Sequence, residues 1–534
     1  MPSSHLTVLE QSAVRYASSP VFKVPRLDLS TKQVLSWESI TYSQFQSDVE
    51  RFARYWSRVL RQDGIPPRSV VGIWLGGMTY TDVLHIYSVC RAGYIPQLFS
   101  LRLPNPEVIY ELLQRAGARA LIHDSSFASL LDSAPVPTHL AATSEQVDPQ
   151  NEPLPVLYNG QPEEIVFIFH TSGSTSGSPK LVPCSYKWLE TTIRKAHQVS
   201  TPLASGRQDV TVWMGSMCHI GQTFMLMGSL QHGSCVIQPT AIAFSSDELI
   251  DMVARCGLNR LNQFATFLAT HLRNSRKDAK LLSIIQNLDE VLYSGLPLAR
   301  EEEDWAYRSG VNLKNLFGST ECGAMLLSIG GRDRSAPLLR SLDGVSYGFV
   351  PTEPSAQTES GHQSTARMLE LVIYAHSGDC PDASLRSADG HLHTGDLFQE
   401  AGPGSYVFRG RDDDWIKSEN SLRCDTKAIE DHVRATCGTL IQECIVVGSG
   451  RPSPALFVEP AGNVDSDKLK REIIRKTRQF HSRRYLHERI TSTNMILIVE
   501  PGTLPRTATK GNIRRKAVEE KYKDTLDAIY GVTC

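Results

Sequence analysis

The sequence predicts an α/β fold in which parallel strands are buried on both faces. Between residues 43 and 123, helical patterns alternate with short runs that are wholly apolar. Strands that are apolar throughout, rather than at every second position, are typical of parallel sheets covered by helices. Hydrophobic residues make up 41% of the 534 residues and charged residues 21%. This balance is that of a globular chain able to bury a sizeable core.

An amphipathic helix is predicted over residues 43–62, because Phe45, Val49 and Phe52 begin an apolar series with spacings of three and four. The elements predicted next are a strand at 70–75, helices at 82–92 and 107–115, and strands at 120–123 and 165–169. Residues 126–162 are rich in proline, serine and asparagine, so we expect a surface connection there.

The rest of the chain divides into three stretches. A second α/β stretch is predicted over about 208–326, and shorter strand-like pieces with glycine turns over 340–410. After that, helix and strand patterns alternate again. The elements predicted in this last stretch are strands at 444–447, 455–458 and 495–499 and a basic helix at 466–480.

Charge and targeting signals narrow the class of protein. The 55 basic and 57 acidic residues nearly cancel, which argues against a nucleic-acid partner. The first residues lack the pattern of a secretory signal, and no apolar stretch approaches the length of a membrane span. The 11 cysteines contain no Cys-x-x-Cys pair, so free buried thiols in a reducing compartment are expected. We therefore expect a cytoplasmic enzyme.

Residues 170–180, HTSGSTSGSPK, follow a predicted strand and have the composition of a phosphate-binding loop. Glycines let backbone N–H groups approach phosphate oxygens, hydroxyls donate hydrogen bonds, and Lys180 adds positive charge. The alternative is a flexible Ser/Gly linker. A Walker loop is excluded because Lys180 follows Pro179 instead of glycine. A hydrolase elbow is excluded because Thr175 stands where the nucleophilic serine would be.

This loop resembles, with one extra residue, the phosphate loop of the adenylate-forming enzymes, which include acyl- and aryl-CoA ligases, peptide synthetase adenylation domains and luciferases. Further motifs similar to those of the family follow in the family's order. They are NLFGSTE at 315–321, TGD at 394–396, GRDDDWIK at 410–417 and LPRTATKG at 504–511. The last loop looks most like that of fungal peptide-synthetase-like adenylating proteins.

The resemblance implies a role for each motif residue. Lys510, Thr320 and Glu321 would be catalytic, with Glu321 also a ligand of Mg²⁺. Asp413 would be the hinge between a large domain (1–409), with a small β-barrel-like part, and a small mobile α+β domain (410–534). The residues that would bind ATP are Thr171, Ser172, Gly173, Ser174, Thr175, Lys180, Asn315, Asp396 and Arg411.

The segment 214–221, MGSMCHIG, occupies the place that borders the acyl pocket in the family. CoA ligases carry a histidine here, as this chain does at His219, and we expect Phe264 and Gly295 to join it as substrate-binding residues. Amino-acid-activating members have a neighbouring aspartate, which is absent here. A buried ammonium without a partner costs several kcal/mol, by order of magnitude. The expected substrate is therefore a small carboxylic acid without an amino group.

The implied reaction has two steps, with ATP, Mg²⁺ and coenzyme A as cofactors or cosubstrates. ATP and the acid form an acyl-AMP, and a thiol then displaces AMP. Because no carrier attachment site follows Lys510, coenzyme A is the preferred thiol, within secondary metabolism. The alternatives are loading of a separate carrier protein and, from another class, a degenerate nucleotide-binding protein without activity.

Overall fold

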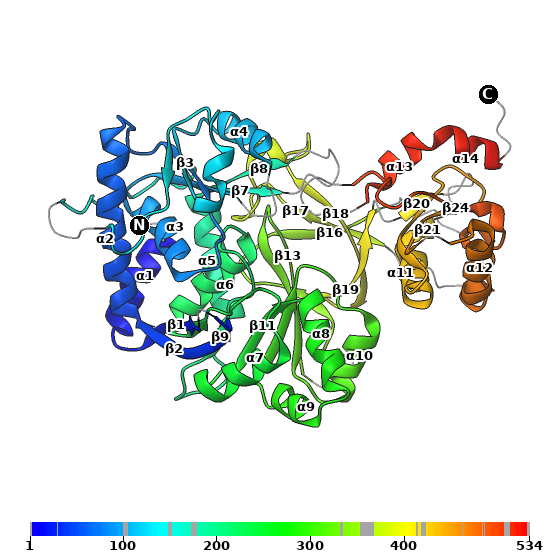
Figure 1. Cartoon of the computed structure of the whole chain (residues 1–534), viewed down its shortest axis with the longest axis horizontal. Helices are drawn as coiled ribbons and strands as arrows, with labels where there is room; N and C mark the ends of the chain where they lie inside the picture. Colours follow the sequence, from blue (N-terminus) through cyan, green and yellow to red (C-terminus); the bar gives the residue numbers. More distant parts are fainter. Residues whose placement is uncertain are drawn as a thin grey trace.

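The amino-terminal part of the chain is built on two large sheets, and the carboxyl-terminal part on two small ones (Figure 1). The structure is a computed structural model. It describes residues 3–28, 30–99, 105–147, 152–171, 179–331, 335–352, 368–412, 415–417, 423–462, 464–482, 484, 486–506 and 513–530.

The first sheet has six strands in the order β6-β5-β3-β4-β7-β8. All neighbours in it are parallel except β7 and β8, so the predicted buried parallel strands are confirmed. The strands are β3 (Val70–Trp74), β4 (Ile95–Phe99), β5 (Ala120–His123), β6 (Thr138–Leu140), β7 (Ile165–Thr171) and β8 (Lys180–Ser185).

One prediction in this region is wrong in part. The segment 126–162 was expected to be only a connection, but β6 lies within it and extends the sheet at its edge. The strand has only three residues and its side chains are exposed or half-buried. Backbone hydrogen bonds to β5, and not burial of apolar side chains, hold β6 in the sheet. The sequence therefore has no apolar run there from which the strand could be predicted.

The second sheet has thirteen strands in the order β16-β17-β18-β19-β15-β14-β13-β12-β11-β9-β10-β1-β2. From β13 through β12, β11, β9 and β10 to β1 the neighbours are parallel, and from β13 to β16 they are antiparallel. The strands are β1 (Pro20–Leu27), β2 (Val34–Thr41), β9 (Val210–Val212), β10 (Cys235–Ile237), β11 (Arg260–Phe264), β12 (Glu290–Ser294), β13 (Leu313–Ser319), β14 (Gly323–Ser328), β15 (Leu339–Ser341), β16 (Tyr347–Pro351), β17 (Leu369–Ile373), β18 (Leu392–Gly402) and β19 (Ser405–Arg411).

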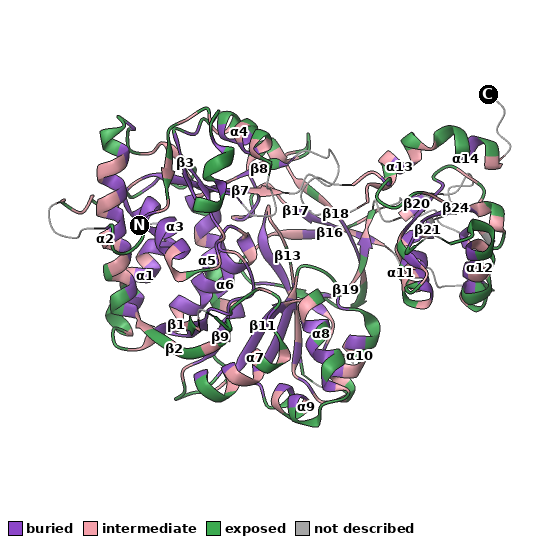
Figure 2. Ribbon diagram, viewed as in Figure 1, coloured by how far each residue is buried: buried purple, intermediate pink, exposed green. Residues whose placement is uncertain are grey.

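The helices of this part cover the sheets. Helix α5 packs against strands of both sheets, and α6 packs against α5 and against strands of the second sheet. Figure 2 shows that these two helices are largely buried, in contrast to the outer helices. The helices are α1 (His5–Arg15), α2 (Tyr42–Gln62), α3 (Tyr80–Arg91), α4 (Pro106–Arg115), α5 (Tyr186–Val199), α6 (Ile220–Gln231), α7 (Ser246–Asp251), α8 (Ala265–Ser275), α9 (Ala279–Gln286) and α10 (Arg300–Arg308). The central position of α5 matters for the site described below.

The start of α2 shows how local sequence sets an element's end. Thr41 accepts a hydrogen bond from the Gln44 N–H, and the Gln44 side chain accepts one from the Thr41 N–H, which is a capping box. The buried face contains Phe45, Val49 and Phe52, as the periodicity predicts.

The carboxyl-terminal part has its own apolar core, in which two-stranded and three-stranded sheets pack with helices. Its strands are β20 (Trp415–Lys417), β21 (Arg423–Asp425), β22 (Ile441–Val447), β23 (Ala455–Pro460) and β24 (Ile496–Ile498), and its helices are α11 (Thr426–Cys437), α12 (Ser466–Ser482), α13 (Arg515–Lys521) and α14 (Lys523–Tyr530). The predicted α/β class with a small α+β carboxyl-terminal part is confirmed.

The ten cysteines within the described ranges are buried free thiols. Among the helices that the structure describes, none is both long and apolar enough to cross a bilayer.

Candidate active site

The predicted phosphate loop connects two paired strands. Thr171, the last residue of β7, pairs with Lys180, the first residue of β8. The loop therefore joins the two strands of a β-hairpin. Thr171 and Lys180, two of the residues expected to contact the phosphates, flank it. The predicted residues Ser172, Gly173, Ser174 and Thr175 lie outside the described residues.

The residue before this loop is held firmly. The two ring nitrogens of His170 lie 2.9 Å from the Leu98 carbonyl and 3.1 Å from Gln97 Nε2. Its ring stacks on Phe99 with the centroids 4.7 Å apart. Burial is the main cause that lowers the pKa of His170 to about 4, so the ring is neutral near pH 7. The entry to the phosphate loop is therefore fixed by contacts with β4.

Thr320 and Glu321 lie in the tight turn between β13 and β14. Ser319 pairs with Gly323 across the turn, and a register shift follows Phe317. A Cβ atom at Gly318 would lie 2.5 Å from the Gly323 carbonyl oxygen, so only glycine allows this close approach. Asn315 lies further back in β13, where its N–H donates to Ser328 Oγ.

The Glu321 backbone is bound while its carboxylate has no partner among the described residues. Trp188 Nε1 of α5 donates to the Glu321 carbonyl oxygen over 2.9 Å. The side chain is half-buried, and no ion pair or hydrogen bond to its carboxylate occurs within the described ranges. A fixed main chain with an unengaged carboxylate suits a ligand of Mg²⁺, which prefers hard oxygen donors.

The three predicted substrate-binding residues come together at the ends of neighbouring elements. Phe264 ends β11, Gly295 follows β12, and His219 caps α6. The rings of His219 and Phe264 meet edge to face at 5.9 Å between centroids. Added Cβ atoms at Gly215 and Gly295 would lie 2.8 and 2.9 Å from the Phe264 ring. The two glycines thus seat this ring between them.

His219 has a defined tautomer. Its Nδ1 accepts a hydrogen bond from the Gly221 N–H over 3.1 Å and so caps α6. The proton of the neutral ring therefore lies on Nε2, which becomes the donor of the side chain.

Asp396 and Arg411 lie opposite each other on β18 and β19. Arg411 Nη1 lies 3.2 Å from Asp396 Oδ1. Asp396 is 7% exposed, and its N–H donates to Thr394 Oγ1. The Gly395 N–H next to it donates to Glu370 Oε1 over 3.0 Å. Asp396 and Arg411, both expected to contact the nucleotide, are therefore cross-strand neighbours.

The two remaining predicted residues, Lys510 and Asp413, lie outside the described residues. The base of the lysine loop is described, however, because Arg506 and Ile513 form a bridge on either side of it. Arg506 also pairs with the fully buried Glu459 at 2.5 Å. The two residues that flank the segment 507–512 are thus paired with each other.

Sequence reasoning missed Trp188 and Lys195, whose side chains bind the turn that carries Glu321. The available signal was a lysine on the buried face of a helix. Lys195 follows Trp188 by seven residues, or about two helical turns, and so lies on the same apolar face.

Two family models match the chain. The AMP-binding enzyme model matches residues 10–347, and the AMP-binding enzyme C-terminal domain model matches residues 413–533. The chain is 35% identical over 522 residues to the AMP-binding domain-containing enzyme iboA of Amanita muscaria (strain Koide BX008), covering 95% of this chain and 99% of that protein.

A second relative is longer. The chain is 24% identical to the adenylate-forming reductase Nps10 of Heterobasidion annosum, covering 93% of this chain and 47% of the reductase. The chain thus spans about half of that reductase and almost all of the Amanita protein.

Solved structures share the fold. The o-succinylbenzoate CoA synthetase of Bacillus subtilis, in complex with its acyl-adenylate intermediate, superposes with a TM-score of 0.73 at 17% identity, covering 96% of this chain and 97% of that chain. The anthranilate CoA ligase AuaEII, in complex with anthranoyl-AMP, gives 0.71 at 18% identity and covers 97% of both chains.

Proposed function

The chain belongs to the AMP-binding enzyme family, and we propose that this adenylate-forming enzyme uses ATP to activate a carboxylic acid without an amino group. The product is an acyl-AMP, from which coenzyme A then takes the acyl group as a thioester. The observation that carries the proposal is the meeting of His219, Phe264 and Gly295 beside the strand that ends in the Thr320–Glu321 turn.

The first step needs two negatively charged groups to approach each other. A carboxylate oxygen of the acid attacks the α-phosphorus of ATP, and the bond to pyrophosphate breaks. Lys180 and Thr171, on either side of the hairpin loop, bind the phosphates, and Thr320 donates to the α-phosphate. Lys510 offsets the repulsion between the two anions, a role that suits a compact charge on a flexible stem.

Glu321 would hold Mg²⁺, which neutralises phosphate charge when it is bound. Asp396 accepts hydrogen bonds from the ribose hydroxyls, Arg411 contacts the nucleotide beside it, and Asn315 lies near the adenine. Arg411 also orients the Asp396 carboxylate through their 3.2 Å ion pair.

The acid pocket favours a substrate without an ammonium group. The neighbours of His219 in the chain carry no charge. Burial raises the pKa of the Cys218 thiol, and the negative charge of the Asp82 carboxylate raises it further. Asp82 is therefore the carboxylate to consider near this segment. Its Oδ2 already accepts the N–H groups of Met78 and Thr79. The aromatic ring of Phe264, seated between two glycines, offers an apolar wall for an aromatic or aliphatic acid.

The second step would use the mobility of the small domain. We place the domain boundary between residues 409 and 410, with Asp413 as the hinge. Rotation about it would withdraw the Lys510 loop and open a path for the thiol. Loading of a separate carrier protein is the second candidate, favoured by the 23% identity to a non-canonical non-ribosomal peptide synthetase.

The test is pyrophosphate release over a panel of carboxylic acids and amino acids, each with and without coenzyme A. We expect release with one class of acids lacking an amino group, and a CoA thioester when coenzyme A is present. Release driven best by an ordinary α-amino acid would contradict the substrate assignment. Acyl-AMP that forms but reacts only with a carrier's thiol would replace coenzyme A by the second candidate. No release with any acid would favour a nucleotide-binding protein without activity.

A further inference from the structure

One helix binds two consecutive backbone carbonyls of the turn that carries Glu321. Trp188 Nε1 donates to the Glu321 carbonyl over 2.9 Å, and Lys195 Nζ donates to the Cys322 carbonyl over 2.7 Å. The next residue, Gly323, has a φ of +67°, and a Cβ there would lie 3.8 Å from Trp188 and Thr192 of the same helix. The turn therefore packs directly against α5.

Lys195 is a fully buried cation with a fully buried counter-ion. Its Nζ lies 2.6 Å from Asp379 Oδ2, and both side chains are 0% exposed. Asp379 also accepts hydrogen bonds from Ser377 Oγ over 2.6 Å and from the Tyr347 hydroxyl. Burial alone would raise the pKa of Asp379, but the charge and hydrogen bond of Lys195, with those of Ser377 and Tyr347, lower it overall. Both oxygens of the Asp379 carboxylate thus have hydrogen-bond partners.

The network connects parts that are far apart in the sequence. Asp379 follows β17, Tyr347 begins β16, and Lys195 belongs to α5. Lys195 contributes more donors than the ion pair needs, and it directs one at the Cys322 carbonyl. Removal of the Lys195 donor would leave the carbonyl of the buried Cys322 without a hydrogen bond. The turn would then favour a different backbone conformation.

We propose that Lys195 and Asp379 are positioning residues for Glu321. They act through the main chain at Cys322 and hold the carboxylate of the preceding residue where the metal-bound phosphates of ATP require it. This inference rests on the proposed function, in which Glu321 binds Mg²⁺.

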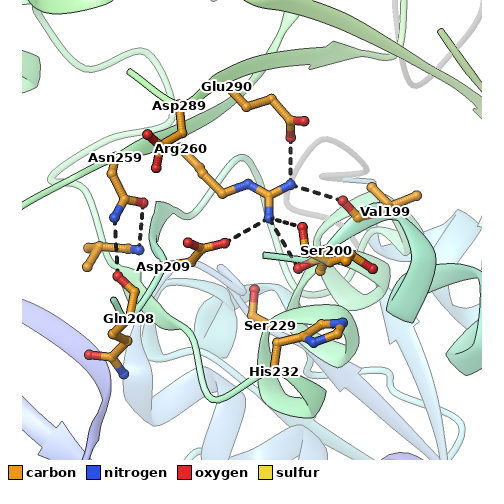
Figure 3. Close-up of polar contacts among 12 residues, drawn as sticks. Val199, Ser200, Gln208, Asp209, Ser229, His232, Asn259, Arg260, Asp289 and Glu290 are labelled. Carbon is orange, nitrogen blue, oxygen red and sulfur yellow. Dashed lines mark hydrogen bonds and ion pairs between the residues drawn. The ribbon is translucent and has the colours of Figure 1, made fainter. Parts of the chain in front are cut away.

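A second buried cation offers a matched control on the same helix. Arg260 binds the Val199 and Ser200 carbonyls at the carboxyl end of α5 and pairs with Asp209 at 2.9 Å and Glu290 at 2.7 Å (Figure 3). Asp209 and Asp379 are therefore both buried aspartates paired with a buried cation that binds main-chain carbonyls. Only the network of Asp379 reaches the Glu321 turn.

The test compares Asp379→Asn and Lys195→Met with Asp209→Asn. For each, the Mg²⁺ concentration at half-maximal effect is measured in two ways. The first is pyrophosphate release with an accepted acid. The second needs no turnover: it is the rise in melting temperature when Mg²⁺ is added at saturating ATP without an acid. We expect Asp379→Asn and Lys195→Met to raise both Mg²⁺ midpoints on the order of tenfold, the scale of losing a residue that orients a ligand.

Asp209→Asn should lower the melting temperature but leave both midpoints at the wild-type value. If Lys195→Met does not fold, Asp379→Asn and the milder Tyr347→Phe carry the test. Wild-type midpoints in Asp379→Asn and Tyr347→Phe, with only a lower melting temperature, would overturn the inference.

Glu321→Gln separates this failure from that of the proposed function. If Glu321→Gln shifts the midpoints and Asp379→Asn does not, the inference alone is wrong. If Glu321→Gln itself keeps the wild-type midpoints, Glu321 is not the ligand, and the proposed metal site is wrong together with the inference.

Discussion

The two ends of strands β11, β12 and β13 differ in how their polar groups are used. At the amino ends, Arg260 of β11 pairs with Glu290 of β12 and with Asp209, which directly precedes the neighbouring β9. These three residues are 1–3% exposed. At the carboxyl ends, the side chain of Phe264 is half-buried, Gly295 is exposed, and the Glu321 carboxylate has no partner within the described residues. The charged groups at the amino ends hold α5 to the sheet. The carboxyl ends leave space and the Glu321 carboxylate for ligands.

This difference follows from the geometry of parallel strands. All their carboxyl ends meet at one edge, where the loops that follow them gather side chains from distant parts of the chain. At the opposite ends, the buried cation Arg260 is matched by two carboxylates and by carbonyls at the end of α5. We therefore expect changes at the amino ends to alter stability and changes at the carboxyl ends to alter activity.

The largest effect on stability is expected at the amino ends. Arg260→Met would leave Asp209 without its buried counter-ion and the end of α5 without its cation, which should cost about 3–5 kcal/mol of unfolding free energy. Urea unfolding measures this loss. The KM for ATP of the folded protein should stay near the wild-type value. A rise in that KM without loss of stability would contradict the division between the two ends.

The largest effect on activity is expected from Lys510, which in the proposed mechanism acts at the carboxyl ends of the strands. Lys510→Ala should slow acyl-AMP formation by about 10²-fold or more, the scale of one electrostatic contact in the transition state. Conversion of supplied acyl-AMP to a thioester should survive, because in the proposed mechanism the Lys510 loop is withdrawn before this step.

The neighbouring Lys516 of α13 is exposed and serves as the control. If Lys516→Ala, and not Lys510→Ala, abolishes adenylation, the assignment of the catalytic lysine is wrong. An equal fall of both half-reactions in Lys510→Ala would also contradict it.

A smaller effect tests the acid pocket. At Gly295, with φ of +89°, an added Cβ would lie 2.9 Å from Phe264 and push its ring out of place. Gly295→Ala should raise the KM for the acid about tenfold, on the scale of 1–3 kcal/mol for a small change in pocket shape, with little change in the KM for ATP.

Gly257→Ala is the matched control, since Gly257 has a φ of +75° and no atom within 4 Å of an added Cβ. Both variants carry similar backbone strain. A rise in the KM for the acid in Gly257→Ala as large as in Gly295→Ala would show that strain, and not contact with Phe264, is the cause.

The smallest effect concerns pH near Asp396. Hydrogen bonds with Asp389 and Glu370 raise the pKa of His393 above its usual 6.5. Since the folded pKa lies above the unfolded one, this stabilisation is complete below about pH 6.5 and is lost as the pH rises through the folded pKa. His393 is partly exposed, so the effect is small. Melting temperatures between pH 5.5 and 8 (roughly the range in which histidine titrates) should fall less steeply in His393→Gln than in the wild type. Identical slopes would contradict the stabilising role of this histidine.

Local sequence determined the elements of this protein. The apolar runs at 70–75 and 120–123 and the periodicity at 43–62 were sufficient, because burial of a strand or a helix face depends on spacing alone. The motif at 315–321 also marked the turn after β13, because a glycine is needed at Gly318, where the backbone approaches itself closely. The family resemblance of the sequence alone indicates Glu321, Asp396 and His219 as candidate site residues.

Only the tertiary structure decided which charges meet. Lys195 pairs with Asp379, 184 residues away, and binds a carbonyl 127 residues away. Arg260 reaches the end of α5, about 60 residues before it in the chain. Periodicity shows that Lys195 lies on a buried face, but the partner of a buried charge depends on which strands the topology places beside it. In this protein, α5 lies against both large sheets, and that position alone connects the Glu321 turn to Lys195 and Asp379.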